Sequence, residues 1–226
     1  MWGLWYGYGR KILTQLTRGK LGRVRANWRE TNRTPSLWWT IPEVRECWNK
    51  LISGDEKVDY YQYVSRKYLS DRKELVGLSL GCGTGHRERK WMALCDFKAL
   101  YGFDISPESI VTANASIQND QHKNILKYEV FDIYKMEFKQ NYYDVIFAEQ
   151  SLHHFAPMKK ILHKISGALK RRGYLILNEF VGPRRFQWTS RELNIANSVR
   201  NILPCQYTKH IVDGSSNKQL IRPSRL

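Results

Sequence analysis

The sequence predicts an α/β fold in which helices cover both faces of a doubly wound, mostly parallel sheet. Short apolar runs alternate with helix-compatible stretches from residue 75 to residue 177, which is typical of parallel strands joined by crossover helices. A glycine-rich loop joins the first apolar run to the first of these helices. Open α/β folds bind ligands at this edge of the sheet. The pattern therefore predicts a ligand-binding domain.

Five apolar segments are the candidate strands. The first, Leu75–Leu80, is an apolar run that ends in glycines, as expected of a buried parallel strand. The others are 99–103, 125–131, 143–148 and 174–177. Residues 169–173 are expected to form a surface turn before the last strand.

Helices are expected between and before these strands. The candidates between them are 86–94, 107–117 and 158–169, the last with a clear apolar face. Two more are expected at about 42–53 and 58–69, separated by a break at Ser53-Gly54-Asp55. Tyr60, Tyr61 and Tyr63 lie in the second of these, where core packing is favoured over a lid above the ligand.

Four parts are expected along the chain. They are a basic aromatic arm (1–40), a helical lid or cap (41–73), the ligand-binding core (74–180) and a basic extension (181–226). A helix is expected to begin near Trp188, with Thr189 or Ser190 as its cap.

The formal net charge is +16, and most of the excess lies in residues 1–50 and 170–226. Basic surfaces attract phosphate, which keeps nucleic-acid binding open as an alternative. The aromatic arm also keeps contact with an anionic membrane surface open, although a solvated or partner-bound arm is favoured.

No apolar run reaches the roughly 20 residues that span a bilayer, and Arg10-Lys11 interrupts any signal-peptide core. The four cysteines form no CxxC pair and no metal-like cluster with histidine, so no metal site is expected. We interpret them as free thiols in a reducing cytoplasm.

The glycine loop, Gly81-Cys82-Gly83-Thr84-Gly85, is the strongest functional signal. Glycines permit positive φ and let a ligand approach the backbone closely. Asp104 ends the next strand, where a carboxylate can accept both hydroxyls of a ribose. The loop lacks the G-x-G-x-x-G spacing of dinucleotide sites and the Gly-Lys-Ser/Thr of a Walker loop, so a different nucleoside ligand is indicated.

These residues resemble the class I S-adenosylmethionine-dependent methyltransferase superfamily. The segment 78–85 is similar to its first motif and 103–106 to its second, while 131–133 resembles its adenine-binding position. Residues 144–155, which end in Leu-His-His-Phe, resemble the fourth-strand motif of the broad small-molecule branch.

The resemblance implies a Rossmann-like fold, S-adenosylmethionine as cofactor and a set of binding residues. The implied cofactor-binding residues are Gly81, Cys82, Gly83, Gly85, Asp104, Ile105, Asp132, Ile133 and Gln150. The family's fold has two further strands, for which only 206–212 and 219–221 are weak candidates. We therefore expect a truncated product or a fold whose last strands are missing.

His154 and His153 are the candidate catalytic residues, because they follow the fourth strand and an imidazole can take a proton near neutral pH. One of them packing locally is the alternative. Glu149, Gln150 and Ser151 are expected where this strand meets the pocket, and Glu179 at the end of the fifth strand lines the pocket or forms an ion pair.

The acceptor is expected to be a small molecule that is methylated on oxygen or nitrogen. The family's amino-methylating nucleic-acid enzymes show Asp/Asn-Pro-Pro-Tyr/Phe where this chain has Glu149-Gln150-Ser151-Leu152, and cytosine C5 enzymes carry a cysteine after a proline that is missing here. An RNA methyltransferase and a catalytically weak binding module stay open as alternatives.

Overall fold

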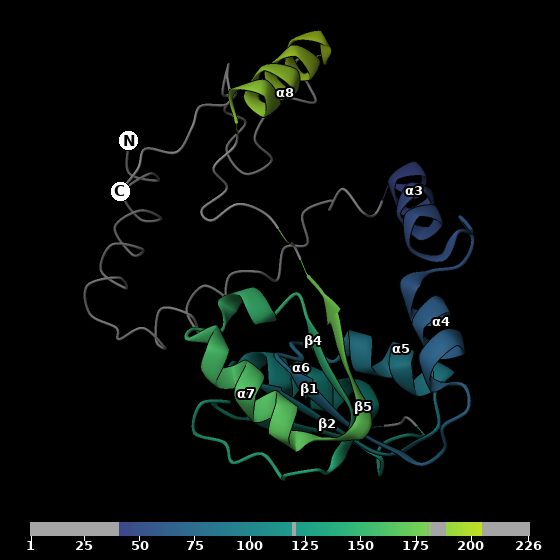
Figure 1. Cartoon of the computed structure of the whole chain (residues 1–226), viewed down its shortest axis with the longest axis vertical. Coiled ribbons are helices and arrows are strands. Elements are labelled where there is room, and N and C mark those ends of the chain that lie inside the picture. Colours follow the sequence, from purple (N-terminus) through teal and green to yellow (C-terminus); the bar gives the residue numbers. More distant parts are fainter. Residues whose placement is uncertain (1–40, 119–120, 180, 182–188, 205–226) are drawn as a thin grey trace. The chain divides into compact units, whose positions relative to one another are not determined.

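The computed structural model describes residues 41–118, 121–179, 181 and 189–204 (Figure 1). The chain divides into two compact units, Met1–Glu179 and Phe180–Leu226. The first contains the sheet and its helices. The predicted arm, 1–40, and the weak strand candidates after residue 205 lie outside the described residues.

A five-stranded sheet with the order β3-β2-β1-β4-β5 forms the centre of the first unit, and every neighbouring pair is parallel. The strands are β1 (Leu75–Leu80), β2 (Phe97–Asp104), β3 (Leu126–Val130), β4 (Tyr143–Glu149) and β5 (Leu169–Asn178). This confirms the predicted α/β class. The chain builds outward from β1 to β3 and then returns to the other side of β1, which makes a switch point between β1 and β4. Ligands bind beside such points at the carboxyl ends of the strands.

Helices cover both faces of the sheet. They are α5 (His86–Leu94), α6 (Pro107–Ile117) and α7 (Met158–Ala168), which begin and end at or next to the predicted residues. Alternate residues of β4 point to opposite faces. Val145 and Phe147 join the core to which α5 and α6 contribute, whereas Ile146 and Ala148 join the core to which α7 contributes. Figure 1 shows α7 on one side of the strands and α5 and α6 on the other.

Among the residues described before β1 there are three helical segments: α3 (Pro42–Ser53), α4 (Tyr60–Val64) and the π-helical turn η2 (Ser65–Leu69). Gly54, with φ of 85°, ends α3 at the predicted break. Asp59 and Gln62 form a capping box that begins α4. Tyr61 is buried, with its ring centroid 4.9 Å from that of Trp91. This residue therefore packs in the core, as favoured from its spacing.

The start of β5 differs from the sequence-based expectation. A surface turn was expected before the strand, but β5 begins directly after α7. Tyr143 pairs with Leu169 and regular pairing resumes only at Tyr174, so residues 170–173 bulge within the strand. A Cβ at Gly173 would lie 3.1 Å from the carbonyl oxygen of Tyr143. The basic residues thus occupy a bulge that requires glycine at its end, rather than a separate turn.

Two carboxyl groups are buried in the core beneath the glycine loop. Glu149 is the last residue of β4, where the sequence predicts that this strand meets the pocket. Its Oε2 accepts a 2.8 Å hydrogen bond from the indole of Trp91, which stacks on Phe147. Burial raises the pKa of Glu149 to about 8. Glu88 accepts a 2.6 Å hydrogen bond from Ser79, and burial raises its pKa as well. The last residue of β4 is therefore a core residue, because strand alternation turns its side chain toward α5.

The second unit contains α8 (Ser190–Ile202) among its described residues. Thr189 accepts a hydrogen bond from the backbone N–H of Glu192 and Glu192 reaches back to Thr189, so the predicted cap is confirmed. Over all the described residues, no helix combines the length and apolar character that crossing a membrane requires.

Replacing Glu149 with Gln should remove a pH dependence of stability. The folded-state pKa of Glu149 lies above its usual value, so the wild type should lose stability as pH rises from about 4.5 to about 8. The neutral amide can still accept from Trp91, and we expect E149Q to be more stable than the wild type at pH 8 by on the order of a few kcal/mol. Denaturant unfolding at pH 5 and pH 8 measures this. Equal pH slopes in both proteins would contradict it.

Candidate functional site

The glycine loop leaves β1 and is tied to the end of the neighbouring strand. The backbone N–H groups of Gly81 and Cys82 both donate to the carbonyl of Phe103, at 2.7 and 3.1 Å. The N–H of Gly83 donates to Oδ2 of Asp104 at 2.9 Å. These three hydrogen bonds fix the loop against the carboxyl end of β2.

The three glycines adopt positive φ for different reasons. φ is 75° at Gly81, 56° at Gly83 and 77° at Gly85. A Cβ at Gly81 would lie 2.6 Å from the Cβ of Ser151, and one at Gly85 would lie 2.4 Å from the hydroxyl oxygen of Tyr128. A Cβ at Gly83 would meet no atom within 4 Å. Gly81 and Gly85 are therefore required by protein packing, whereas the space at Gly83 is open.

Asp104 is held in a fixed orientation. Besides its bond to Gly83, its Oδ1 accepts a 2.8 Å hydrogen bond from the N–H of Ser106. A carboxylate has about four lone-pair positions, so two backbone donors leave each oxygen able to accept another hydrogen bond. The side chain can therefore bind vicinal hydroxyls without moving.

The segment after β3 forms another wall of the site. Oδ1 of Asp132 accepts a 3.0 Å hydrogen bond from the N–H of Tyr134, which closes a tight turn. The ammonium group of Lys164, on α7, donates to the carbonyls of Tyr134 at 3.0 Å and Met136 at 2.8 Å. This wall has no helix of its own, so contacts from α7 hold it in place.

The turn after β4 is held from two neighbouring strands. The hydroxyl of Ser151 donates to the carbonyl of Leu80 at 2.6 Å. Glu179, after β5, accepts from the N–H groups of Ser151 at 2.7 Å and Leu152 at 2.5 Å. The expectation that Glu179 forms a structural ion pair is consistent with its 2.7 Å contact to Nδ1 of His153.

The two candidate histidines have different surroundings. Both belong to the 3₁₀ turn η3 (Leu152–His154), and their ring centroids are 3.9 Å apart. His153 points to Glu179, whereas His154 lines the pocket. Burial, and to a smaller degree the neighbouring His153, lower the pKa of His154. A neutral imidazole is therefore favoured at the pocket wall.

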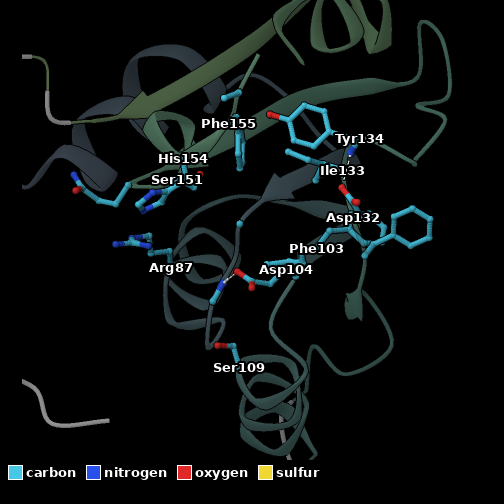
Figure 2. A pocket seen from close by; sticks show the side chains of 16 residues that line it. Arg87, Phe103, Asp104, Ser109, Asp132, Ile133, Tyr134, Ser151, His154 and Phe155 are labelled. Carbon is cyan, nitrogen blue, oxygen red and sulfur yellow. Dashed lines mark hydrogen bonds between the residues drawn. The ribbon is translucent and has the colours of Figure 1, made fainter. Parts of the chain in front are cut away.

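A cavity of about 430 Å³ opens where these segments meet (Figure 2). Eight of the predicted site residues line it: Gly81, Gly83, Asp104, Ile105, Asp132, Ile133, Gln150 and His154. Three do not. Cys82 is buried in the core, Gly85 is the N-cap of α5, and His153 binds Glu179.

Other residues line the cavity that sequence reasoning did not single out. They include Arg87, Ser109, Tyr134 and Phe155. Arg87 and Ser109 lie in the first turns of α5 and α6, directly after the two motifs. Their positions could have indicated a role, because the first turn of a helix that follows a binding loop faces the same edge of the sheet.

The cavity lies within the stretch of chain that is similar to a known family. A family model described as a methyltransferase domain matches residues 78–177, from β1 to β5. No curated protein sequence matches this chain.

Several solved structures resemble the chain in fold. The [4+2]-cyclase SpnF is 20% identical, covering 58% of this chain and 47% of its own, with a TM-score of 0.49. An S-adenosylmethionine-dependent methyltransferase from Mesorhizobium loti is 22% identical, covering 51% of both chains, with a TM-score of 0.44. The YcgJ protein from Bacillus subtilis is 19% identical, covering 57% of this chain and 53% of its own, with a TM-score of 0.46.

The chain spans about half the length of these three structures. The family match begins within β1 and ends within β5, and it includes the loops that form the cavity. The part of the chain that forms the sheet and the cavity is therefore similar to a methyltransferase domain.

Proposed function

We propose that this chain transfers a methyl group from S-adenosylmethionine to an oxygen or nitrogen atom of a small-molecule acceptor. The observation that carries the proposal is the convergence of the glycine loop, Asp104, Asp132 and His154 on one cavity. These groups come from the carboxyl ends of four strands, at and beside the switch point of the sheet.

The cavity fits an adenosine-bearing ligand. Its volume, about 430 Å³, lies within the range of small-molecule pockets. Gly83 leaves open space next to the backbone, Asp104 has lone pairs for ribose hydroxyls, and Asp132 and Ile133 line the side toward β3. Figure 2 shows Asp104 between Arg87 on one side and Asp132 on the other.

When bound, S-adenosylmethionine supplies an electrophilic methyl group on its sulfonium. The chain's own contribution is to hold the acceptor atom in line with that methyl group and to exclude competing water. An acceptor with a proton of high pKa also needs a base. His154 lines the cavity as a neutral imidazole and can take this proton at a ring nitrogen.

A small acceptor is supported by the residues at the end of β4. Ser151 and Leu152 are fixed by Glu179, and Glu149-Gln150-Ser151-Leu152 contains neither a proline nor an aromatic residue on which a base could stack. A cytoplasmic location is also part of the proposal, and the free thiols of Cys47, Cys82 and Cys95 are compatible with it.

Calorimetry with S-adenosylmethionine and S-adenosylhomocysteine tests the binding step. Turnover of methyl-labelled S-adenosylmethionine with a metabolite panel and with total RNA then tests the acceptor class. We expect binding of both ligands and label transfer to a metabolite. Transfer to RNA alone would replace the acceptor proposal, and an absence of binding would overturn the whole proposal.

Replacing His154 with Ala should lower kcat by about 10²- to 10⁴-fold, as expected for loss of a general base. The affinity for S-adenosylhomocysteine should change little, and His153→Ala should have the smaller effect on kcat. Because the pKa of His154 lies below 6.5, the imidazole should be neutral at pH 7 and the wild-type kcat should be high there. The wild-type kcat should fall only when the pH drops below the pKa of His154. Steady-state kinetics from pH 5 to 9 measures both effects. Unchanged kcat in H154A would remove the base.

Gly83→Ala and Gly85→Ala form a matched pair. Both place alanine at positive φ, which costs about 1–2 kcal/mol of stability. Only G85A also forces Cβ against Tyr128, whose hydroxyl donates to the Gly85 carbonyl at 2.8 Å, so it should cost about 1–3 kcal/mol more. G83A should instead weaken S-adenosylhomocysteine binding about tenfold, because its methyl group occupies ligand space. Thermal unfolding and calorimetry measure the pair, and equal losses of stability would contradict the assignment.

A further inference from the structure

The cavity carries opposite charges at its two sides. Asp132 lies on the side toward β3, and Asp104 lies near the centre. Arg87 lies on the other side, close to His154 in the view of Figure 2. Among the described residues that line the cavity, Arg87 is the one with a permanent positive charge. A ligand with an anionic group at one end would match this distribution.

The position of Arg87 is electrostatically costly for the protein itself. It is the second residue of α5, where the helix dipole places partial positive charge and disfavours a cation. Arg89 and Lys90 add to the positive charge of the same turns. Burial, and then Arg87, Lys90 and Arg89, lower the pKa of His86 to about 4. An anion bound here would relieve this repulsion.

The guanidinium of Arg87 also has a neighbour that orients it. It forms a hydrogen bond with the hydroxyl of Tyr61, whose pKa burial raises to about 12 while Arg87 opposes the rise. Tyr61 packs against Trp91 in the core. Arg87 is thus half-buried and attached to a rigid element, so less side-chain entropy is lost when it binds a ligand.

We propose that Arg87 binds the α-carboxylate of S-adenosylmethionine and so sets the direction in which the cofactor lies. The inference rests on the proposed function. The carboxylate is the only anionic group of that molecule, and the planar guanidinium suits a carboxylate. The ribose hydroxyls are donors and match Asp104. In S-adenosylmethionine the sulfonium lies between the carboxylate and the ribose. With the carboxylate on Arg87 and the ribose on Asp104, the methyl group lies on the side of the cavity that His154 lines.

Decarboxylated S-adenosylmethionine gives a direct test, because it lacks only this carboxylate. Calorimetry should show that Arg87→Met weakens S-adenosylmethionine binding by about tenfold, the loss expected for one hydrogen bond to a charged group. Binding of the decarboxylated compound should change by less than about twofold. Arg87→Lys should recover part of the affinity for S-adenosylmethionine alone, since it restores the charge without the planar fork.

Lys90→Met is the matched control. It removes the same charge one turn along α5 from a residue that does not line the cavity. We expect it to leave the ratio of the two affinities at the wild-type value, and thermal unfolding confirms that each variant is folded.

Equal losses for both compounds in R87M, or no loss for either, would overturn the inference. If the wild type binds both compounds equally well, the inference also fails while the proposed function stands. If the wild type binds neither compound nor S-adenosylhomocysteine, the proposed function itself fails.

Discussion

The hydrogen bonds between the glycine loop and the end of β2 are the constraint on which the site depends. The carbonyl of Phe103 accepts from two consecutive N–H groups of the loop, and the next residue, Asp104, accepts from a third. One strand end therefore determines both the shape of the loop and the orientation of the carboxylate. Without this connection, the open space at Gly83 and the lone pairs of Asp104 would not face the same cavity.

Two further walls of the cavity, the turn after β4 and the segment after β3, depend on contacts from distant parts of the chain. The turn after β4 is anchored to β1 through Ser151 and to the end of β5 through Glu179. The wall after β3 is held by Lys164 of α7. Each anchor satisfies backbone polar groups that would otherwise lie unpaired next to the cavity. Rigid walls of this kind suit a reaction whose rate depends on alignment.

Acidic side chains occupy two environments in this domain, the core and the surface of the cavity. Glu88 and Glu149 are buried under the loop, where burial raises the pKa of both and favours their neutral forms. Asp104 and Asp132 lie at the cavity surface and Arg87 on its other side. The position of each acidic residue in the fold thus decides whether its side chain is buried in the core or lines the cavity.

The sequence by itself determined the order and type of the elements, because apolar periodicity and glycine spacing are local properties. The bounds of β1, α5 and α6 and the placement of Asp104 at a strand end followed from it. The roles of the site residues remain predictions.

Only the tertiary structure decided which of two adjacent histidines lines the cavity, because that depends on a turn anchored by Glu179, 26 residues from His153 along the chain. Packing likewise decided that Glu149 enters the core and that residues 170–173 bulge within β5. For Arg87, the sequence predicts its place in the first turn of α5, but its hydrogen bond to Tyr61 depends on the tertiary structure. The orientation of a side chain depends on neighbours that are remote in sequence.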